Sequence, residues 1–365
     1  MEIRDRILAL DVFRGLTIAG MIIVNNQGDW SHVYRPLRHA AWHGWYLADL
    51  VFPFFLFIMG VSLAVSLGKR MGDESVRTGL HGRILRRTLV LVALGLALNL
   101  IPAFDWTAFR IPGVLQRIGL CYLICALLYV HLGTRGFWIA ALTLLAGYTL
   151  LMELVPVPGF GAGIWEPRAN LPGYLDSLIL GAHTYKHAPV RGFDPEGVLT
   201  TLPAAVSALA GVLAGEWLRS ERTLGEKLRG LLSAALICLL AGTILDRWIP
   251  INKNLWTPSY TVFMTGMALF LLVFCLWLIG GKGMRRWSFP FEVLGLNAIL
   301  AYLLSSALGK LMIAASWHLK EKIFSSFFLP IAGGEAASLL YALAYLLLWT
   351  GVCALLYRFR IFLKI

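Results

Sequence analysis

Two histidines and a carboxylate lie close together in one polar stretch of this chain. His39 and His43 are separated by three residues, and Asp49 follows just before a long apolar run. A carboxylate can fix the tautomer of an imidazole and stabilise its protonated form, which leaves the second ring nitrogen free to take a proton. The pattern predicts a general base for an attacking amine or hydroxyl. The structural alternative is a histidine that is merely hydrogen-bonded at a membrane surface. No third ligand follows at a recognisable spacing, so we expect no metal.

Polar side chains also occur in the apolar run before these histidines. Asn25 and Asn26 end that run, and an asparagine there either caps a helix or aims its amide at a ligand. Within the run, Asp11 and Arg14 have the spacing of a pair on one helical face. Because a charge inside a membrane helix is costly, Arg14 either serves this structural pair or meets an anionic ligand that enters from the cytoplasmic half.

Further polar groups stand at the borders of later apolar runs. Arg117 begins one run, and residues 252–254 form a polar cluster just before another. Asp194 and Pro195 have the pattern of a helix start, with the aspartate as N-cap and the proline in the first helical position. That last feature needs no function.

The elements that must carry these residues are membrane helices. Of the 365 residues, 58% are hydrophobic and 14% are charged, and the mean hydropathy is +0.73. Soluble domains are nearer half apolar and a quarter charged, so an ordinary soluble enzyme is excluded. The net charge of +12 does not indicate nucleic-acid binding, because Lys and Arg lie in short loops rather than on one face among aromatic residues.

A spanning helix needs roughly 20 mostly apolar residues, because the hydrocarbon layer is about 30 Å thick. Ten runs meet this condition, over residues 7–24, 48–67, 84–100, 114–132, 137–154, 199–218, 228–245, 260–279, 294–315 and 337–357. Membrane strands are excluded because these runs lack the alternation of a barrel. We predict an all-α polytopic membrane protein with about ten transmembrane helices.

The distribution of positive charge predicts the orientation. With an even number of helices both termini share one face, and Lys and Arg are denser in the short loops of that face. The positive-inside rule therefore predicts that both termini are cytoplasmic. The longest connector, about residues 155–198, is then extracytoplasmic and too long to be a mere link. We expect residues 1–365 to form one transmembrane domain that carries this loop.

Eight segments spread over the chain carry a resemblance to a known family. They are DVFRGLTIAGMIIVNN (11–26), HAAWHG (39–44), ADLVFPFFLFIMG (48–60), GVLQR (113–117), PGYLDSLILG (172–181), FDPEG (193–197), NKNLW (252–256) and FRIFLKI (359–365). In this order they resemble the transmembrane heparan-α-glucosaminide N-acetyltransferase family and its bacterial sugar-acetyltransferase members. The resemblance covers nearly the whole chain, so it is more specific than any single motif.

The resemblance implies that acetyl-CoA gives up an acetyl group from the cytoplasmic side. It implies that an amino sugar, such as glucosamine or a glycan containing glucosamine or N-acetylglucosamine, accepts the group at the far side. The family's active-site histidine falls on His39, its acidic neighbour on Asp49 and its motif asparagine on Asn25. Relatives commonly have asparagine at the position of His43, which is therefore not the expected base. An integral protein of the bacterial inner membrane, surrounded by lipid and forming a homodimer, is also implied.

These parts predict a mechanism. We expect His39 to act as the base, Asp49 to orient it, and Asn25 to donate to the oxyanion that develops on the thioester carbonyl. A second possibility makes His39 the nucleophile, with an acetyl-imidazole intermediate. A sugar permease is the non-enzymatic alternative, because buried charges and aromatic outer loops also suit a transporter.

The donor's phosphates need cationic partners. Arg14 is the expected contact in the inner half of the first helix. The sugar or the acyl end of the donor is expected to meet groups on the outer side, which are Arg117, Asn252, Lys253 and Asn254.

Overall fold

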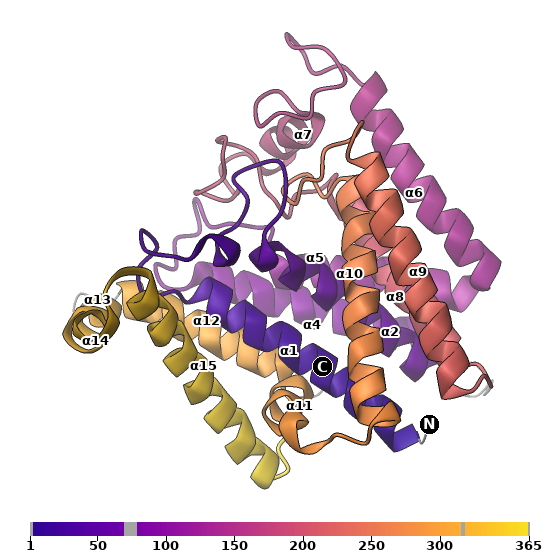
Figure 1. Cartoon of the computed structure of the whole chain (residues 1–365). Helices are drawn as coiled ribbons and strands as arrows, with labels where there is room; N and C mark the ends of the chain where they lie inside the picture. The colour runs from indigo at the N-terminus through magenta and orange to yellow at the C-terminus, as the bar shows by residue number, and fades with distance from the viewer. Residues whose placement is uncertain (1–2, 69–78, 315–317, 364–365) are drawn as a thin grey trace.

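The computed structural model describes residues 3–68, 79–314 and 318–363, and it is built of helices. In chain order these are α1 (Ile3–Asn25), α2 (Val51–Leu67), α4 (Leu80–Leu100), α5 (Val114–His131), α6 (Thr134–Leu154), α7 (Leu171–Leu180), α8 (Thr201–Arg219), α9 (Leu224–Leu245), α10 (Pro258–Leu276), α11 (Phe289–Leu296), α12 (Ala298–Ala314), α13 (Leu319–Ile323), α14 (Leu329–Ala332) and α15 (Gly334–Arg358) (Figure 1). Within these residues there is no strand, only isolated β-bridges. The predicted all-α class is confirmed.

Helices occur at all ten predicted positions, but not all of them qualify as membrane spans. Among the described residues, eight helices are long and apolar enough to cross a membrane, and the bent pair α11 and α12 makes a ninth if it counts as one span. The helix outside this set is α4. Its first turns carry Arg83, Arg86 and Arg87, and these charges lower its apolar character.

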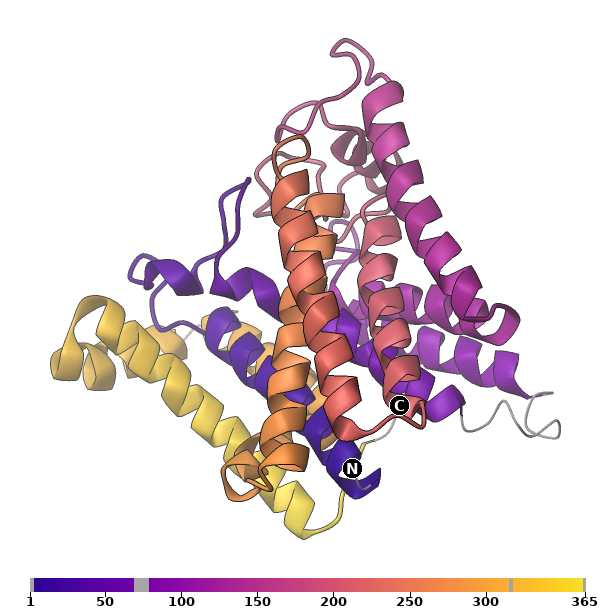
Figure 2. The same cartoon turned by 45° about the vertical axis from the view of Figure 1, so that its right-hand side comes forward.

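Both ends of the helical bundle are recognisable in the two views. α1 begins and α15 ends at the same end of the bundle (Figures 1 and 2). The long connectors after α1 and after α6 lie at the opposite end, together with α7. This arrangement agrees with termini that share one face, and the compartment that each face meets stays a prediction.

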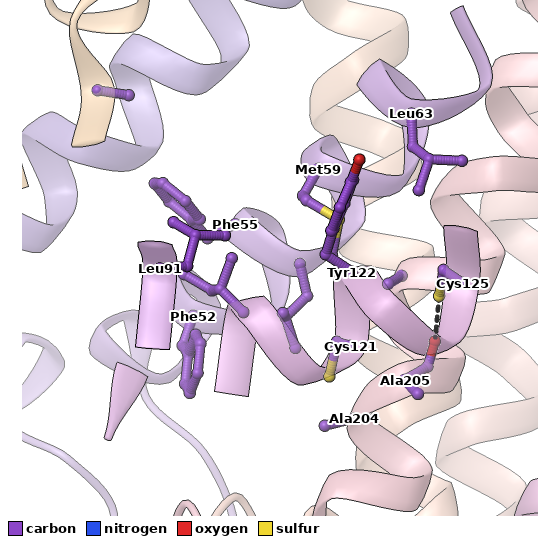
Figure 3. Packing of buried hydrophobic residues seen from close by; sticks show 14 of the residues in the cluster. Phe52, Phe55, Met59, Leu63, Leu91, Cys121, Tyr122, Cys125, Ala204 and Ala205 are labelled. Atoms are coloured by element: carbon purple, nitrogen blue, oxygen red, sulfur yellow. Dashed lines mark hydrogen bonds between the residues drawn. The ribbon is translucent and has the colours of Figure 1, made fainter. Parts of the chain in front are cut away.

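α2 lies in the interior of the bundle, where it contacts α1, α5, α8 and α10. Its side chains Phe52 and Met59 pack in one apolar cluster with Leu91 of α4, Tyr122 of α5 and Ala204 of α8 (Figure 3). Such a helix is apolar on all sides because every face meets another helix. α2 therefore holds the polar residues at its outer end in fixed positions.

Glycines allow α2 and α8 to approach closely. A Cβ at Gly60 of α2 would meet the carbonyl oxygen of Ala208, and a Cβ at Gly211 of α8 would meet the carbonyl oxygen of Phe57. Small residues at such contacts let helix backbones pack directly, which is a main source of attraction between membrane helices.

The outer helices expose apolar faces. Ile139 and Leu142 of α6 and Ile237 and Leu240 of α9 are exposed. An apolar face of this extent on an isolated chain suits contact with lipid.

Three long-range hydrogen bonds fix the connector between α1 and α2. Trp42 Nε1 donates to the carbonyl of Trp165 at 2.8 Å, and the Gly44 amide donates to the carbonyl of Ile251 at 2.7 Å. Tyr260 donates its hydroxyl to the Asp49 carbonyl at 2.7 Å. The segment that carries the two histidines is therefore held against the segment that precedes α10.

Candidate active site

The structure brings His39 and Asp49 into direct contact. His39 lies on the connector, and Asp49 lies in a short helical turn, Leu47–Leu50, that leads into α2. His39 Nδ1 is 2.7 Å from Asp49 Oδ1. The other carboxylate oxygen accepts from the backbone amides of Ala40 at 3.1 Å and Tyr46 at 2.9 Å. Asp49 is fully buried, and these bonds supply the partners that a buried carboxylate requires.

Lys253 joins this pair. Its Nζ lies 3.2 Å from Asp49 Oδ1 and 3.0 Å from His39 Nδ1. If Nδ1 carries the ring proton, it donates to Asp49, and Nε2 keeps a free lone pair. If Lys253 donates to Nδ1 instead, the ring proton lies on Nε2. A base needs the first tautomer, and Asp49 favours it because a carboxylate only accepts.

The surroundings of His39 keep its ring neutral. Burial and the Lys253 ammonium lower the pKa of His39 below its usual range, although Asp49 acts in the opposite direction. The side chain is 44% exposed, and it lines two cavities. Among the described residues its Nε2 has no hydrogen-bond partner. A neutral imidazole with a free nitrogen meets the requirement for a base.

Two cavities meet at His39. The large cavity, of about 840 Å³, lies between the outer ends of α1, α4, α5 and α12 and residues 185–187. The small cavity, of about 110 Å³, lies between α1, the start of α2 and the start of α5. Asn25, His39 and Val114 line both. Groups bound in the two cavities would therefore meet at these residues.

Asn25 and its neighbour differ in what their amides do. Asn26 is buried and donates to the carbonyl of Ile22 at 2.9 Å, which completes the end of α1. Asn25 is exposed to both cavities, and its side-chain amide has no hydrogen-bond partner among the described residues. Asn26 therefore stabilises the helix end, while the Asn25 amide is available to a ligand.

The sequence did not predict an ion cluster that lies beside His39. Arg110 Nε lies 2.8 Å from Asp194 Oδ2, and Nη2 lies 2.5 Å from Asp194 Oδ1. Arg110 also pairs with Glu196. Arg110 lines the large cavity and Glu196 lines the small one. Burial opposes ionisation of Glu196, but the positive charges of Arg110, Arg117 and Lys253 together outweigh it and lower the pKa of this carboxyl.

The predicted role of Asp194 as a helix N-cap is wrong. α8 begins at Thr201, with Thr200 in the N-cap position. Asp194 instead accepts from Arg110, 84 residues earlier in the chain. The only local sign of this ion cluster is the pair of acidic residues at 194 and 196. Their spacing carries no information about a partner as distant in the chain as Arg110.

The polar cluster before α10 contributes one residue to the cavities. Lys253 lines the small cavity, whereas Asn252 and Asn254 line neither. Asn252 is fully buried, and its Oδ1 accepts from the Leu255 amide at 2.9 Å. Its Nδ2 lies 3.3 Å from His43 Nδ1. Asn252 therefore holds the turn that presents Lys253.

Arg14 and Arg117 line neither cavity. Arg14 donates to Asp11 at 3.0 Å and to Ser62 at 2.8 Å, and it precedes Asn25 by about 16 Å of helix at 1.5 Å per residue. Arg117 is buried, donates to the Gly197 carbonyl at 3.1 Å, and bonds the Thr200 hydroxyl. The structure does not bring either arginine to His39.

Comparison with known proteins gives a consistent result. The family model for heparan-alpha-glucosaminide N-acetyltransferase, catalytic, matches residues 6–243 of this chain. Two curated relatives are named heparan-alpha-glucosaminide N-acetyltransferase. The chain is 29% identical to the one from Mus musculus over 416 residues and 30% identical to the one from Homo sapiens over 415 residues. Each alignment covers 99% of this chain, which spans 61% and 60% of the length of these relatives.

Proposed function

The chain belongs to the heparan-alpha-glucosaminide N-acetyltransferase family, and from this premise we propose that it transfers an acetyl group from acetyl-CoA to an amino sugar or a glucosamine-containing glycan. One observation carries the proposal beyond family membership. His39, with its Nδ1 bonded to Asp49 and its Nε2 free, stands beside the free amide of Asn25 in the wall shared by two cavities. A base and an oxyanion donor at one point are what acyl transfer requires.

The proposed reaction is a direct transfer. The neutral amine, or a hydroxyl, of the acceptor attacks the thioester carbonyl carbon while His39 Nε2 takes its proton. The carbonyl oxygen becomes an oxyanion that the Asn25 amide stabilises. The carbon–sulfur bond then breaks, and the proton passes from His39 to the departing thiolate. The products are the acetylated sugar and free CoA.

The acceptor is assigned to the large cavity. The large cavity has room for a sugar and carries the cationic residues Arg110, Lys186 and Lys310 in its lining. Contact of Arg14 with the donor phosphates, and of Arg117, Asn252 and Asn254 with the sugar or the acyl end of the donor, stay predictions. None of these four residues lines either cavity. The homodimer, the cytoplasmic side of donor entry and the bacterial inner membrane stay predictions.

The test uses purified full-length protein with labelled acetyl-CoA and glucosamine. We expect release of the CoA thiol together with labelled acetylated sugar. His39→Ala and Asn25→Ala should each lower turnover about a hundredfold or more, because each removes a group that acts in the transition state. His43→Ala is the matched control. It lies in the same loop, lines neither cavity, and should keep most of the activity.

Other outcomes separate the alternatives. Uptake of sugar into vesicles without thiol release would contradict the enzyme and support a permease. Parallel lines in double-reciprocal plots, together with acetylated His39 in the absence of acceptor, would replace direct transfer by an acetyl-histidine intermediate.

A further inference from the structure

The small cavity differs in lining from the large one. Six of its residues are apolar, and they come from α1, from the turn before α2 and α2 itself, and from α5. These are Met21, Val24, Ala48, Val51, Phe52 and Val114. Its polar members are those already described around His39. A chamber of this kind accepts a short apolar group whose polar end stays near His39.

The volume of this half-open cavity bounds the size of the group that its walls can surround. An apolar cavity of about 150 Å³ takes a benzene ring, which corresponds to about 25 Å³ for each heavy atom. On that scale the small cavity, at about 110 Å³, holds about four heavy atoms. An acetyl group has three and a propionyl group has four, whereas a butyryl group has five. The chamber therefore fits the two shortest of these acyl groups.

We propose that the small cavity is the acyl pocket of the donor site and that its apolar wall sets the length of acyl chain the protein transfers. This inference rests on the proposed function. The carbonyl of the thioester lies at Asn25 and His39, and the methyl end points toward Met21 and Phe52. The small cavity has no room for the rest of CoA, so CoA and the acceptor both reach this carbonyl from the large cavity.

Met21 offers the sharpest test, because the chain contains a matched control. Met21 and Met59 are buried to similar extents, at 5% and 8% exposure, in the same apolar cluster. Met59 packs with Tyr122 in the cluster (Figure 3) and lines neither cavity. Met21→Ala and Met59→Ala remove the same atoms from the core. Only the first change enlarges the small cavity.

The experiment measures kcat/KM with acetyl-, propionyl- and butyryl-CoA at fixed glucosamine, with release of the CoA thiol as the readout. One methylene too many in an apolar pocket costs about tenfold or more. We expect the wild type to use butyryl-CoA at least about tenfold less well than propionyl-CoA. Met21→Ala should raise the butyryl-to-acetyl ratio about tenfold, and Met59→Ala should leave it as in the wild type. Because both kcat/KM values in a ratio come from the same preparation, a smaller fraction of folded protein lowers both equally and leaves the ratio unchanged.

A second variant works in the opposite direction. Val51→Ile adds one methyl group to the wall of the small cavity and should lower the propionyl-to-acetyl ratio. If the butyryl-to-acetyl and propionyl-to-acetyl ratios are the same in the wild type, Met21→Ala and Val51→Ile, the small cavity is not an acyl pocket. This result would overturn the proposal even where acetyl transfer itself is intact.

Failure of the proposed function gives a different result. If the wild type releases no thiol from acetyl-CoA, binding is measured instead by calorimetric titration. The ligands are ketone analogues of the same three thioesters, in which a methylene separates the carbonyl from the sulfur. Tighter binding of the longer analogue to Met21→Ala than to Met59→Ala would uphold the pocket without the reaction. Equal affinities, or no binding, would overturn it.

Discussion

Lys253 acts on the two members of the His39–Asp49 pair in opposite senses. Its ammonium attracts the Asp49 carboxylate at 3.2 Å and repels a proton on the imidazole at 3.0 Å. The Glu196 carboxylate favours the protonated ring, as Asp49 does. The protonation state of His39 is therefore a balance of one cation, two carboxylates and burial.

Removal of that ammonium should shift the pH dependence of turnover. In Lys253→Met the pKa of His39 rises, because a positive charge beside the ring is lost while Asp49 and Glu196 remain. The base works when it is neutral, so activity is lost as the pH falls through this pKa. The acid limb of kcat/KM should consequently move to higher pH, and activity at high pH should persist.

Lys253→Arg is the matched control and should keep the acid limb of the wild type. The pH dependence of the reaction of His39 with diethyl pyrocarbonate, followed by mass spectrometry, reports the same pKa without turnover. An acid limb in Lys253→Met that coincides with that of the wild type would remove Lys253 from this role.

The sequence was informative about this site only over short distances. His39 and Asp49 are ten residues apart, and the chemistry of a histidine beside a carboxylate was enough to pair them. Arg110 and Glu196 belong to the same neighbourhood but are 86 residues apart. Tertiary packing alone decides such a contact, so no local pattern predicts it. For Arg14 the sequence predicts either a pair with Asp11 or a ligand contact, and the structure shows the pair with Asp11 together with a bond to Ser62.

Among the helices, the contact of α2 with α8 depends on the absence of side chains. In Gly60→Ala the new methyl group would overlap the Ala208 carbonyl, and the helices would have to separate. We expect a loss of about 1–3 kcal/mol in the free energy of unfolding, measured by denaturant titration in detergent.

Gly147→Ala on α6 provides the comparison. Its Cβ would meet open space, and alanine favours the helix by up to about 1 kcal/mol. Equal stability of Gly60→Ala and Gly147→Ala would contradict the proposed role of the close contact.

Apolar runs predicted the positions of the long helices because lipid imposes the same length and composition on each. The exceptions follow from local chemistry. The run at 294–315 is bent by 73° between α11 and α12, at Asn297, and hydropathy carries no signal of a bend. α7 is a helix of 10 residues inside the long connector, too short to stand out as a span.

For the whole molecule, the predicted orientation can be measured by labelling. Phe160 lies in the turn after α6 and Glu221 lies in the turn between α8 and α9, at opposite ends of the bundle (Figures 1 and 2). With a membrane-impermeant maleimide added to intact cells, Phe160→Cys should react and Glu221→Cys should react only after lysis. The reverse pattern would invert the topology. The native cysteines are buried or half-buried, and the unsubstituted protein controls for them.

The two cavities lay beyond sequence analysis because they belong to the assembled molecule. The large cavity combines residues from both ends of the sequence, among them Asn25 and Lys310. Composition predicted that such helices would pack, but the space that they leave depends on how side chains from distant segments meet.

Asn297 connects the bend in the bundle to the final segment of the chain. It is buried, its Nδ2 donates to the Ile361 carbonyl at 3.1 Å, and its Oδ1 accepts from the Leu363 amide at 3.0 Å. Truncation before Ile361 would leave both groups of this amide unsatisfied, at about 1–3 kcal/mol for each. An affinity handle at the carboxyl end therefore needs a flexible spacer, so that purification does not pull this backbone away from the amide that it satisfies.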